Sequence, residues 1–163
     1  IVFLAAFPEM SQWGWTSGFL ILPVLLALVF RGVYPSYLLS FNHALIELQA
    51  RVAAYLFLLT DDYPSIERNP KMAVLLPDVE GGKKLGRVLQ IFKIIFAIPL
   101  IVVGVFYLAL ALVVTFFAWI HTWSTGRYPD WALKIVLGTI QYWNRLNGYA
   151  VLLVTDEYPR FTL

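Results

Sequence analysis

The sequence predicts an all-α membrane protein with two repeats, each an apolar helix or helical hairpin followed by an amphipathic interfacial helix. Three observations lead to this prediction. Of the 163 residues, 60 % are hydrophobic and only 13 % are charged, whereas soluble domains carry roughly 25 % charged residues. Lys and Arg are absent from two long apolar stretches, within 1–30 and 94–126. The same motifs also occur twice along the chain in the same order, with 94 or 95 residues between the copies.

The repeat emerges when the chain is compared with itself. Tyr34 and Tyr128, each followed by proline, are 94 residues apart. A Thr-Asp-Asp-Tyr-Pro segment at 60–64 matches a Thr-Asp-Glu-Tyr-Pro segment at 155–159, at an offset of 95 residues. Several landmarks in the same order and at the same spacing indicate an internal duplication.

The duplication divides the chain into a membrane repeat at 1–64, a polar linker at 65–86 and a second membrane repeat at 87–163. Prolines, glycines and mixed charges in the linker are typical of a solvated connection. The chain starts with Ile1 inside an apolar run, so we expect a further N-terminal segment before it. Cysteine is absent from the sequence, which excludes disulfides and thiolate metal sites.

Each repeat opens with an apolar stretch, at 1–30 and at about 88–123. A helix over the second stretch would be about 50 Å long at 1.5 Å per residue, against a hydrocarbon core of roughly 30 Å. We therefore expect Pro99 together with Gly104 to break or tilt it. In the first repeat, turn-forming residues and two tryptophans at 9–18 predict a helical hairpin with its tip in that segment.

A glycine and a Tyr-Pro pair follow each apolar stretch. Gly32 and Gly126 supply the permissive φ angle that ends a helix. Pro35 and Pro129 are suited to the first position of the next helix, where the missing N–H costs nothing. The sequence therefore predicts a tight turn into a second helix in both repeats.

The second helices are expected at about 36–60 and 130–154, and each carries a polar stripe at steps of three or four residues, which indicates one helical face. The stripes contain Ser36, Ser40, His43, Glu47 and Arg51 in the first helix and Asp130, Lys134, Gln141 and Arg145 in the second. Glu47 and Arg51 have the spacing of an ion pair within a helix. Gln141 replaces that glutamate in the second repeat, so Arg145 lacks this partner.

Lipid or partner contacts are expected from the stripes and from the tryptophans, because basic side chains bind lipid phosphates and indole rings favour membrane interfaces. The residues assigned to such contacts are Arg51, Arg145, Glu47, Gln141, Trp119, Trp123, Trp131 and Trp143. For the two arginines, pairing within the chain is an equally open interpretation.

Three membrane arrangements remain open: a hairpin followed by a surface helix, a single crossing followed by a flat helix, or two spanning helices. All twelve basic residues lie at 31–93 or 127–160. The hairpin arrangement places them on one side, with the basic loops in the cytoplasm, as the positive-inside rule favours. Two spanning helices would bury charges at roughly 2.5–3.5 kcal/mol each on insertion scales.

Neither histidine has the sequence context of a ligand site. His43 and His121 are candidate ligands of a haem or chlorophyll, but Leu137 replaces His43 in the second repeat. His121 stands between Trp119 and Trp123, where an interfacial ring is well accommodated. No catalytic set, metal-ligand spacing or phosphate-binding loop is found, and no basic patch suited to nucleic acid. We predict no enzyme activity, no cofactor and no metal.

Three segments also carry a resemblance to a known family: 92–99 (FKIIFAIP), 125–129 (TGRYP) and 155–163 (TDEYPRFTL). They resemble a family of small bacterial membrane proteins catalogued as a domain of unknown function, with the pattern Lys-Trp-x-x-x-x-Ile-Pro-His, Thr-Gly-Arg-Tyr-Pro and Thr-Asp-x-Tyr-Pro-Pro-Phe. The resemblance covers the second repeat and the first from about Phe30. Leu100 replaces the family histidine and Arg160 the second proline. The resemblance implies a bacterial cytoplasmic-membrane protein, often present in tandem copies, and no reaction.

The function predicted from these features is a non-catalytic accessory or scaffold subunit of a larger membrane complex, in contact with lipid and with partner helices. One alternative is a transporter or channel component that uses the polar stripe at 40–51 as a path, which requires the second helix to span. Another alternative is a subunit that binds pigment or haem through His43 or His121.

Overall fold

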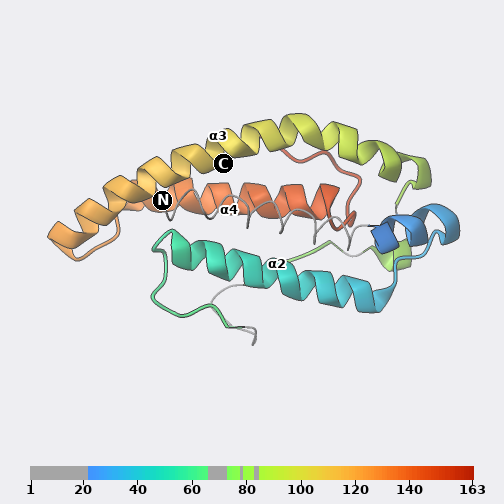
Figure 1. The fold of residues 1–163 in the computed structure, drawn as a ribbon, viewed down its shortest axis with the longest axis horizontal. Coiled ribbons are helices and arrows are strands. Elements are labelled where there is room, and N and C mark those ends of the chain that lie inside the picture. Colours follow the sequence, from blue (N-terminus) through green and yellow to red (C-terminus); the bar gives the residue numbers. More distant parts are fainter. Residues whose placement is uncertain (1–21, 66–72, 78, 83–84) are drawn as a thin grey trace, which may run out of the picture.

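The computed structural model describes residues 22–65, 73–77, 79–82 and 85–163 (Figure 1). Their elements are the π-helix η1 (Ala27–Arg31), α2 (Ser36–Leu56), the 3-10 helix η2 (Glu80–Gly82), α3 (Arg87–Thr125) and α4 (Asp130–Ala150). Since these ranges contain helices and no strand, the predicted all-α class is confirmed for them. The predicted hairpin tip at 9–18 lies outside the described residues.

Helix α3 is continuous over 39 residues, through both Pro99 and Gly104. Of the two expected outcomes, a break or a tilt, the break is therefore wrong, and the second predicted repeat contains one apolar helix rather than a hairpin. In Figure 1, α3 arcs over α4, and α2 lies on the other side of α4. A Cβ atom at Gly104 would approach Tyr142 and Trp143 to 3.1 Å. The glycine thus admits the aromatic side chains of α4.

Small residues form the α3 side of the interface with α4, the most extensive helix–helix contact in the described chain. Ala97, Gly104, Ala111 and Ala118 are all buried and recur every seven residues. A seven-residue repeat keeps one seam of a helix against its neighbour, and small side chains allow a close approach of the two backbones. The α4 side contributes larger buried residues, among them Val136, Tyr142 and Leu146.

The turns into α2 and α4 have the same backbone geometry. Gly32 and Gly126 adopt left-handed φ values of 62° and 69° at the ends of the preceding helices, as predicted. Pro35 and Pro129 directly precede their helices with extended ψ values of 124° and 136°. They therefore lie one position before the predicted one, in the capping position itself.

Both second helices end four residues earlier than predicted, at Leu56 and Ala150. Shortly after each end a leucine adopts a positive φ, 60° at Leu58 and 56° at Leu153. Because this conformation is costly for a residue with a side chain, the surrounding contacts must maintain it. The period of the polar stripe gave no sign of these reversals, since the apolar residues around them continue the helical pattern.

Two tyrosines connect the α2 and α4 regions by reciprocal hydrogen bonds. The hydroxyl of Tyr34, before α2, donates to the carbonyl of Leu152, after α4, over 2.7 Å. The hydroxyl of Tyr128, before α4, donates to the carbonyl of Phe57, after α2, over 3.3 Å. The start of each helix therefore lies near the end of the other, so α2 and α4 are antiparallel, as Figure 1 shows.

Part of the predicted polar linker is packed into the core. Val79 and Leu85 are buried in one apolar cluster with Tyr34, and Val74 packs against it. The segment is therefore not wholly solvated, contrary to the expectation from its composition. Isolated apolar residues between prolines and glycines carry no periodic signal, so only the tertiary structure reveals their burial.

The close α3–α4 contact predicts a large effect of one glycine. We expect Gly104→Leu to destabilise the protein by roughly 1–3 kcal/mol, because a new side chain would overlap Tyr142 and Trp143. Thermal unfolding of the detergent-purified protein would measure it. The control is Val105→Leu, at a neighbouring position that is 54 % exposed. Equal unfolding temperatures of the two variants would contradict this account of the α3–α4 interface.

Candidate functional site

The largest exposed apolar surface of the described chain follows α3. Its segment Ile95–Thr125 is the one described helix long and apolar enough to cross a membrane, and only 22 % of its most apolar window is buried. Phe106 and Phe117 are 70 % and 56 % exposed. A core helix of a soluble protein would be covered on most sides, whereas α3 is covered along one seam. The predicted apolar surface is thus present on this helix.

Three of the four tryptophans assigned to lipid or partner contact are exposed. Trp119 and Trp123 stack near the end of α3 with ring centroids 6.1 Å apart, and Trp131 lies exposed at the start of α4. Trp143 is instead half-buried and faces Gly104. His121, which lies between these two tryptophans in sequence, is exposed, with its Nδ1 atom 3.2 Å from the hydroxyl of Thr125.

Polar side chains of the α2 stripe bind other groups of the same chain. His43 Nε2 donates to the carbonyl of Val74 over 2.6 Å. The predicted Glu47–Arg51 ion pair is present at 3.2 Å, and Arg51 is only 6 % exposed. Arg51 also donates to the carbonyl of Ser65 over 2.6 Å. The stripe therefore fastens the segments that follow α2 onto the helix.

Arg145 has a role in α4 similar to that of Arg51 in α2. Its guanidinium donates to the carbonyl of Thr162 in the C-terminal segment. Its Nε–H is buried and has no hydrogen-bond partner among the described residues. Gln141, one turn earlier, is exposed. Both arginines thus bind the segment after their own helix.

An ion pair between a buried lysine and a partly exposed aspartate joins α3 to the same C-terminal segment. Lys93 is fully buried, and its Nζ atom lies 2.7 Å from Asp156 Oδ1 and donates to the carbonyl of Thr155 over 2.7 Å. The carboxylate also accepts from the Gly86 N–H over 2.7 Å and from the Gln90 amide over 2.9 Å. This cluster was missed in the sequence analysis. A lone lysine within an apolar run was the available signal, because such a charge needs a partner when buried.

The surroundings of this pair shift both pKa values downward. Burial alone would raise the pKa of Asp156, but the Lys93 ammonium, the Gly86 N–H and the Gln90 amide outweigh it and hold that pKa below its ordinary value. Burial lowers the pKa of Lys93, although Asp156 opposes this shift. The carboxylate is therefore well stabilised in its charged form.

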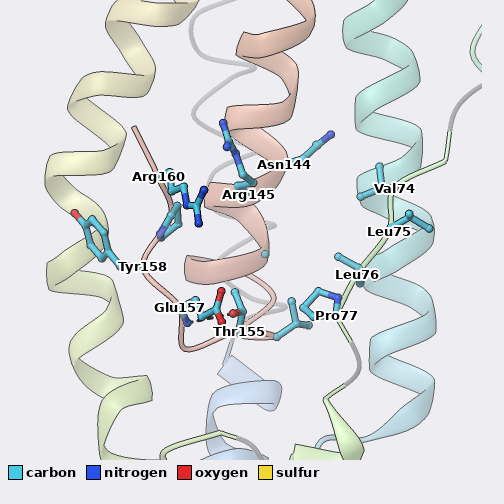
Figure 2. A pocket seen from close by; sticks show the side chains of 13 residues that line it. Val74, Leu75, Leu76, Pro77, Asn144, Arg145, Thr155, Glu157, Tyr158 and Arg160 are labelled. Atoms are coloured by element: carbon cyan, nitrogen blue, oxygen red, sulfur yellow. Dashed lines mark hydrogen bonds between the residues drawn. The ribbon is translucent and has the colours of Figure 1, made fainter. Parts of the chain in front are cut away.

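A groove of about 450 Å³ lies beside this cluster, between the C-terminal half of α4, the C-terminal segment and residues 74–77. In Figure 2, Arg145 of α4 and Arg160 and Glu157 of the C-terminal segment lie on one side of the groove. The side chains of 74–77 lie on the other side, next to α2. One wall is therefore polar with an excess of positive charge, and the opposite wall is apolar. This combination suits a ligand that has an anionic and an apolar part.

Metal-binding chemistry has no support in the parts of the chain that the structure describes, where no three His, Asp or Glu side chains form a group that could hold an ion. His43 is bound to the backbone of the linker, and His121 lies exposed on α3.

The residues that the structure describes form an all-helical fold, and among them one helix is long and apolar enough to cross a membrane. Residues 89–162 match the family described as Domain of unknown function (DUF4389). The match supports, for the second predicted repeat, the resemblance to a family of unknown function. Comparisons with curated proteins and with solved structures gave no match.

Removal of the Asp156 carboxylate tests the ion pair. We expect Asp156→Asn to destabilise the protein by ~3–5 kcal/mol, because the fully buried Lys93 would lose its counter-ion. Chemical unfolding of the detergent-purified protein at pH 7 would measure the change. Glu157→Gln is the matched control, since Glu157 is exposed and adjacent. Equal stability of the two variants would exclude a stabilising role for the pair.

The pair also predicts a pH dependence. The pKa of Asp156 is lower in the folded than in the unfolded chain. Its contribution is therefore fully present above the ordinary pKa of 3.8 and is lost as the pH falls through the lower folded value. We expect the stability difference between the native protein and Asp156→Asn to be constant at neutral pH and to shrink below about pH 4. A difference that stays unchanged in unfolding curves down to pH 2 would contradict this assignment.

Proposed function

We propose that this protein is a non-catalytic subunit of a larger membrane complex in a bacterial cytoplasmic membrane, where it acts as a scaffold in contact with lipid and partner helices. The observation that carries the proposal is the exposed apolar surface of α3 over Ile95–Thr125. Large contiguous apolar patches are rare on soluble monomers, and they mark contact with a membrane or another protein.

In this proposal α3 crosses the membrane once. Its apolar segment of 31 residues is about 46 Å long at 1.5 Å per residue, and the hydrocarbon core is roughly 30 Å thick. The excess length is taken up by tilt or by ends that reach the headgroups. Trp119 and Trp123 then lie at one interface, where indole rings are favoured.

Exposed polar groups on α4 favour a partner protein over lipid alone. Helix α4 runs antiparallel along the apolar seam of α3, yet Lys134 and Gln141 on it are exposed. Lipid tails offer no hydrogen-bond partner for an amide or an ammonium group. Polar residues at this depth normally face other protein segments. A neighbouring subunit that covers this face of α4 would satisfy them.

We further propose that the chain arose by duplication, so that it contains two related membrane repeats. The support is the recurrence of geometry at offsets of 94 and 95 residues: left-handed glycines, capping prolines, positive-φ leucines and the reciprocal tyrosine bonds. The donors Arg51 and Arg145 are likewise 94 residues apart, and each binds a backbone carbonyl of the segment after its helix, Ser65 or Thr162.

The observed contacts favour the scaffold over the two alternatives. A transport path along α2 needs its polar stripe to face an open channel, and His43, Glu47 and Arg51 instead bind one another or the neighbouring backbone. A haem or chlorophyll ligand needs a cavity at the histidine. His121 is exposed on the outer face of α3.

Photo-crosslinking tests the scaffold role. With benzoyl-phenylalanine at Phe106 or Phe117, we expect crosslinks to one defined membrane protein in intact cells, because both positions are exposed on α3. Mass spectrometry of the adducts identifies the partner. The control position is Tyr142, which is fully buried.

Two results together would overturn the scaffold role. They are adducts with lipid alone at both exposed positions, and purification in mild detergent as a monomer without a co-purifying protein.

A further inference from the structure

We propose that the groove between α4, the C-terminal segment and residues 74–77 binds one membrane lipid through its phosphate headgroup. The proposal rests on the proposed membrane crossing of α3, and it does not depend on the scaffold role. It concerns a ligand site with defined residues, whereas the scaffold role concerns the outer face of α3.

The first support is the depth of the groove in the membrane, which its position along α3 gives. About 20 helical residues cross a hydrocarbon core, and counted back from the Trp119 interface they end near Leu100. The hydroxyl of Tyr142 donates to the Leu100 carbonyl over 2.8 Å. Because α4 runs antiparallel to α3, Arg145 lies one turn beyond Tyr142, on the headgroup side of that level.

The C-terminal segment brings a second cation to the same level. The hydroxyl of Tyr158 lies 3.4 Å from the Phe96 carbonyl, and the hydroxyl of Tyr107 donates to the Phe161 carbonyl over 2.5 Å. These contacts place Arg160, which lies between Tyr158 and Phe161 in sequence, between the levels of Phe96 and Tyr107 on α3. The Lys93–Asp156 pair fixes the other end of this segment.

The polar wall has the chemistry of a phosphate site. Arg145 and Arg160 line the groove with Glu157 as the one lining carboxylate, so the lining has a net positive charge. Guanidinium groups bind phosphate oxygens through several parallel N–H donors. The buried Nε–H of Arg145 has no acceptor among the described residues, and a buried donor without an acceptor is costly.

The opposite wall suits the apolar part of a lipid. Val74, Leu75 and Leu76 line it, and Leu75 is 92 % exposed. An aliphatic chain against these side chains would remove apolar surface from water. Free phosphate would use only the arginine wall, so the two-sided groove favours a lipid over a free anion.

Native mass spectrometry of the detergent-purified full chain tests the proposal, with phosphatidylglycerol, phosphatidylcholine and inorganic phosphate as separate additions. We expect one phosphatidylglycerol per chain to remain bound. In Arg145→Gln/Arg160→Gln its affinity should fall by at least about tenfold, because charge-assisted hydrogen bonds are lost. Arg127→Gln is the control, since Arg127 is exposed in the turn between α3 and α4. Arg160→Gln alone keeps the Arg145–Thr162 contact and should give a partial loss.

Several outcomes overturn the lipid site. They are equal binding by the double variant and the control, equal retention of phosphatidylglycerol by the single variant and the native protein, and inorganic phosphate bound as tightly as the lipid. If the native protein and the double variant retain phosphatidylcholine equally well, the two arginines do not bind the charged headgroup. Alkaline carbonate extraction of membranes tests the crossing of α3 separately. A protein released by carbonate would overturn the crossing, whatever the lipid titration gives.

Discussion

Close packing of α3 against α4 is the constraint on which the other contacts depend. A heptad of small residues, from Ala97 to Ala118, forms a narrow seam that brings α4 against α3 and leaves the rest of α3 exposed. Gly104 within that seam admits Tyr142, whose hydroxyl then reaches the Leu100 carbonyl. With α4 held there, the C-terminal segment can fold back beside both helices. Leu163 lies so close to Gly138 of α4 that a Cβ atom at position 138 would approach it to 2.9 Å. Larger residues on this seam would move α4 outward and separate the walls of the groove.

The Lys93–Asp156 pair gives this arrangement its specificity. An apolar helix slides easily along another apolar surface, because dispersion contacts have little directional preference. A fully buried ammonium has only a few acceptable positions, and here it needs Asp156 and the Thr155 carbonyl. The pair thereby fixes the register of the C-terminal segment on α3. Such pairs are weak contributors to net stability but effective at selecting one arrangement, a role that we assign to this pair as a hypothesis.

Two arginines in this fold attach the segments that follow their helices. On both α2 and α4 an arginine near the end of the helix donates to a backbone carbonyl of the segment that follows, at Ser65 and at Thr162. The sequence left lipid contact and pairing within the chain equally open for these residues. The structure assigns the backbone contacts to both, and Arg145 also lines the groove. Binding within the chain and binding of a headgroup are therefore compatible at Arg145.

The sequence by itself determined the helical class, the starts of α2 and α4, and the glycine turns before them, because these depend on local periodicity and backbone preference. It also indicated the Glu47–Arg51 pair, which needs only the geometry of a single helix. Only the tertiary structure decided that α3 stays continuous through Pro99, since the packed α4 supports it. Burial of Val79 and the partners of Lys93 were likewise invisible in the sequence. Those contacts join segments far apart in the sequence, as from Lys93 to Thr155, 62 positions later, and no local pattern specifies which distant segments meet.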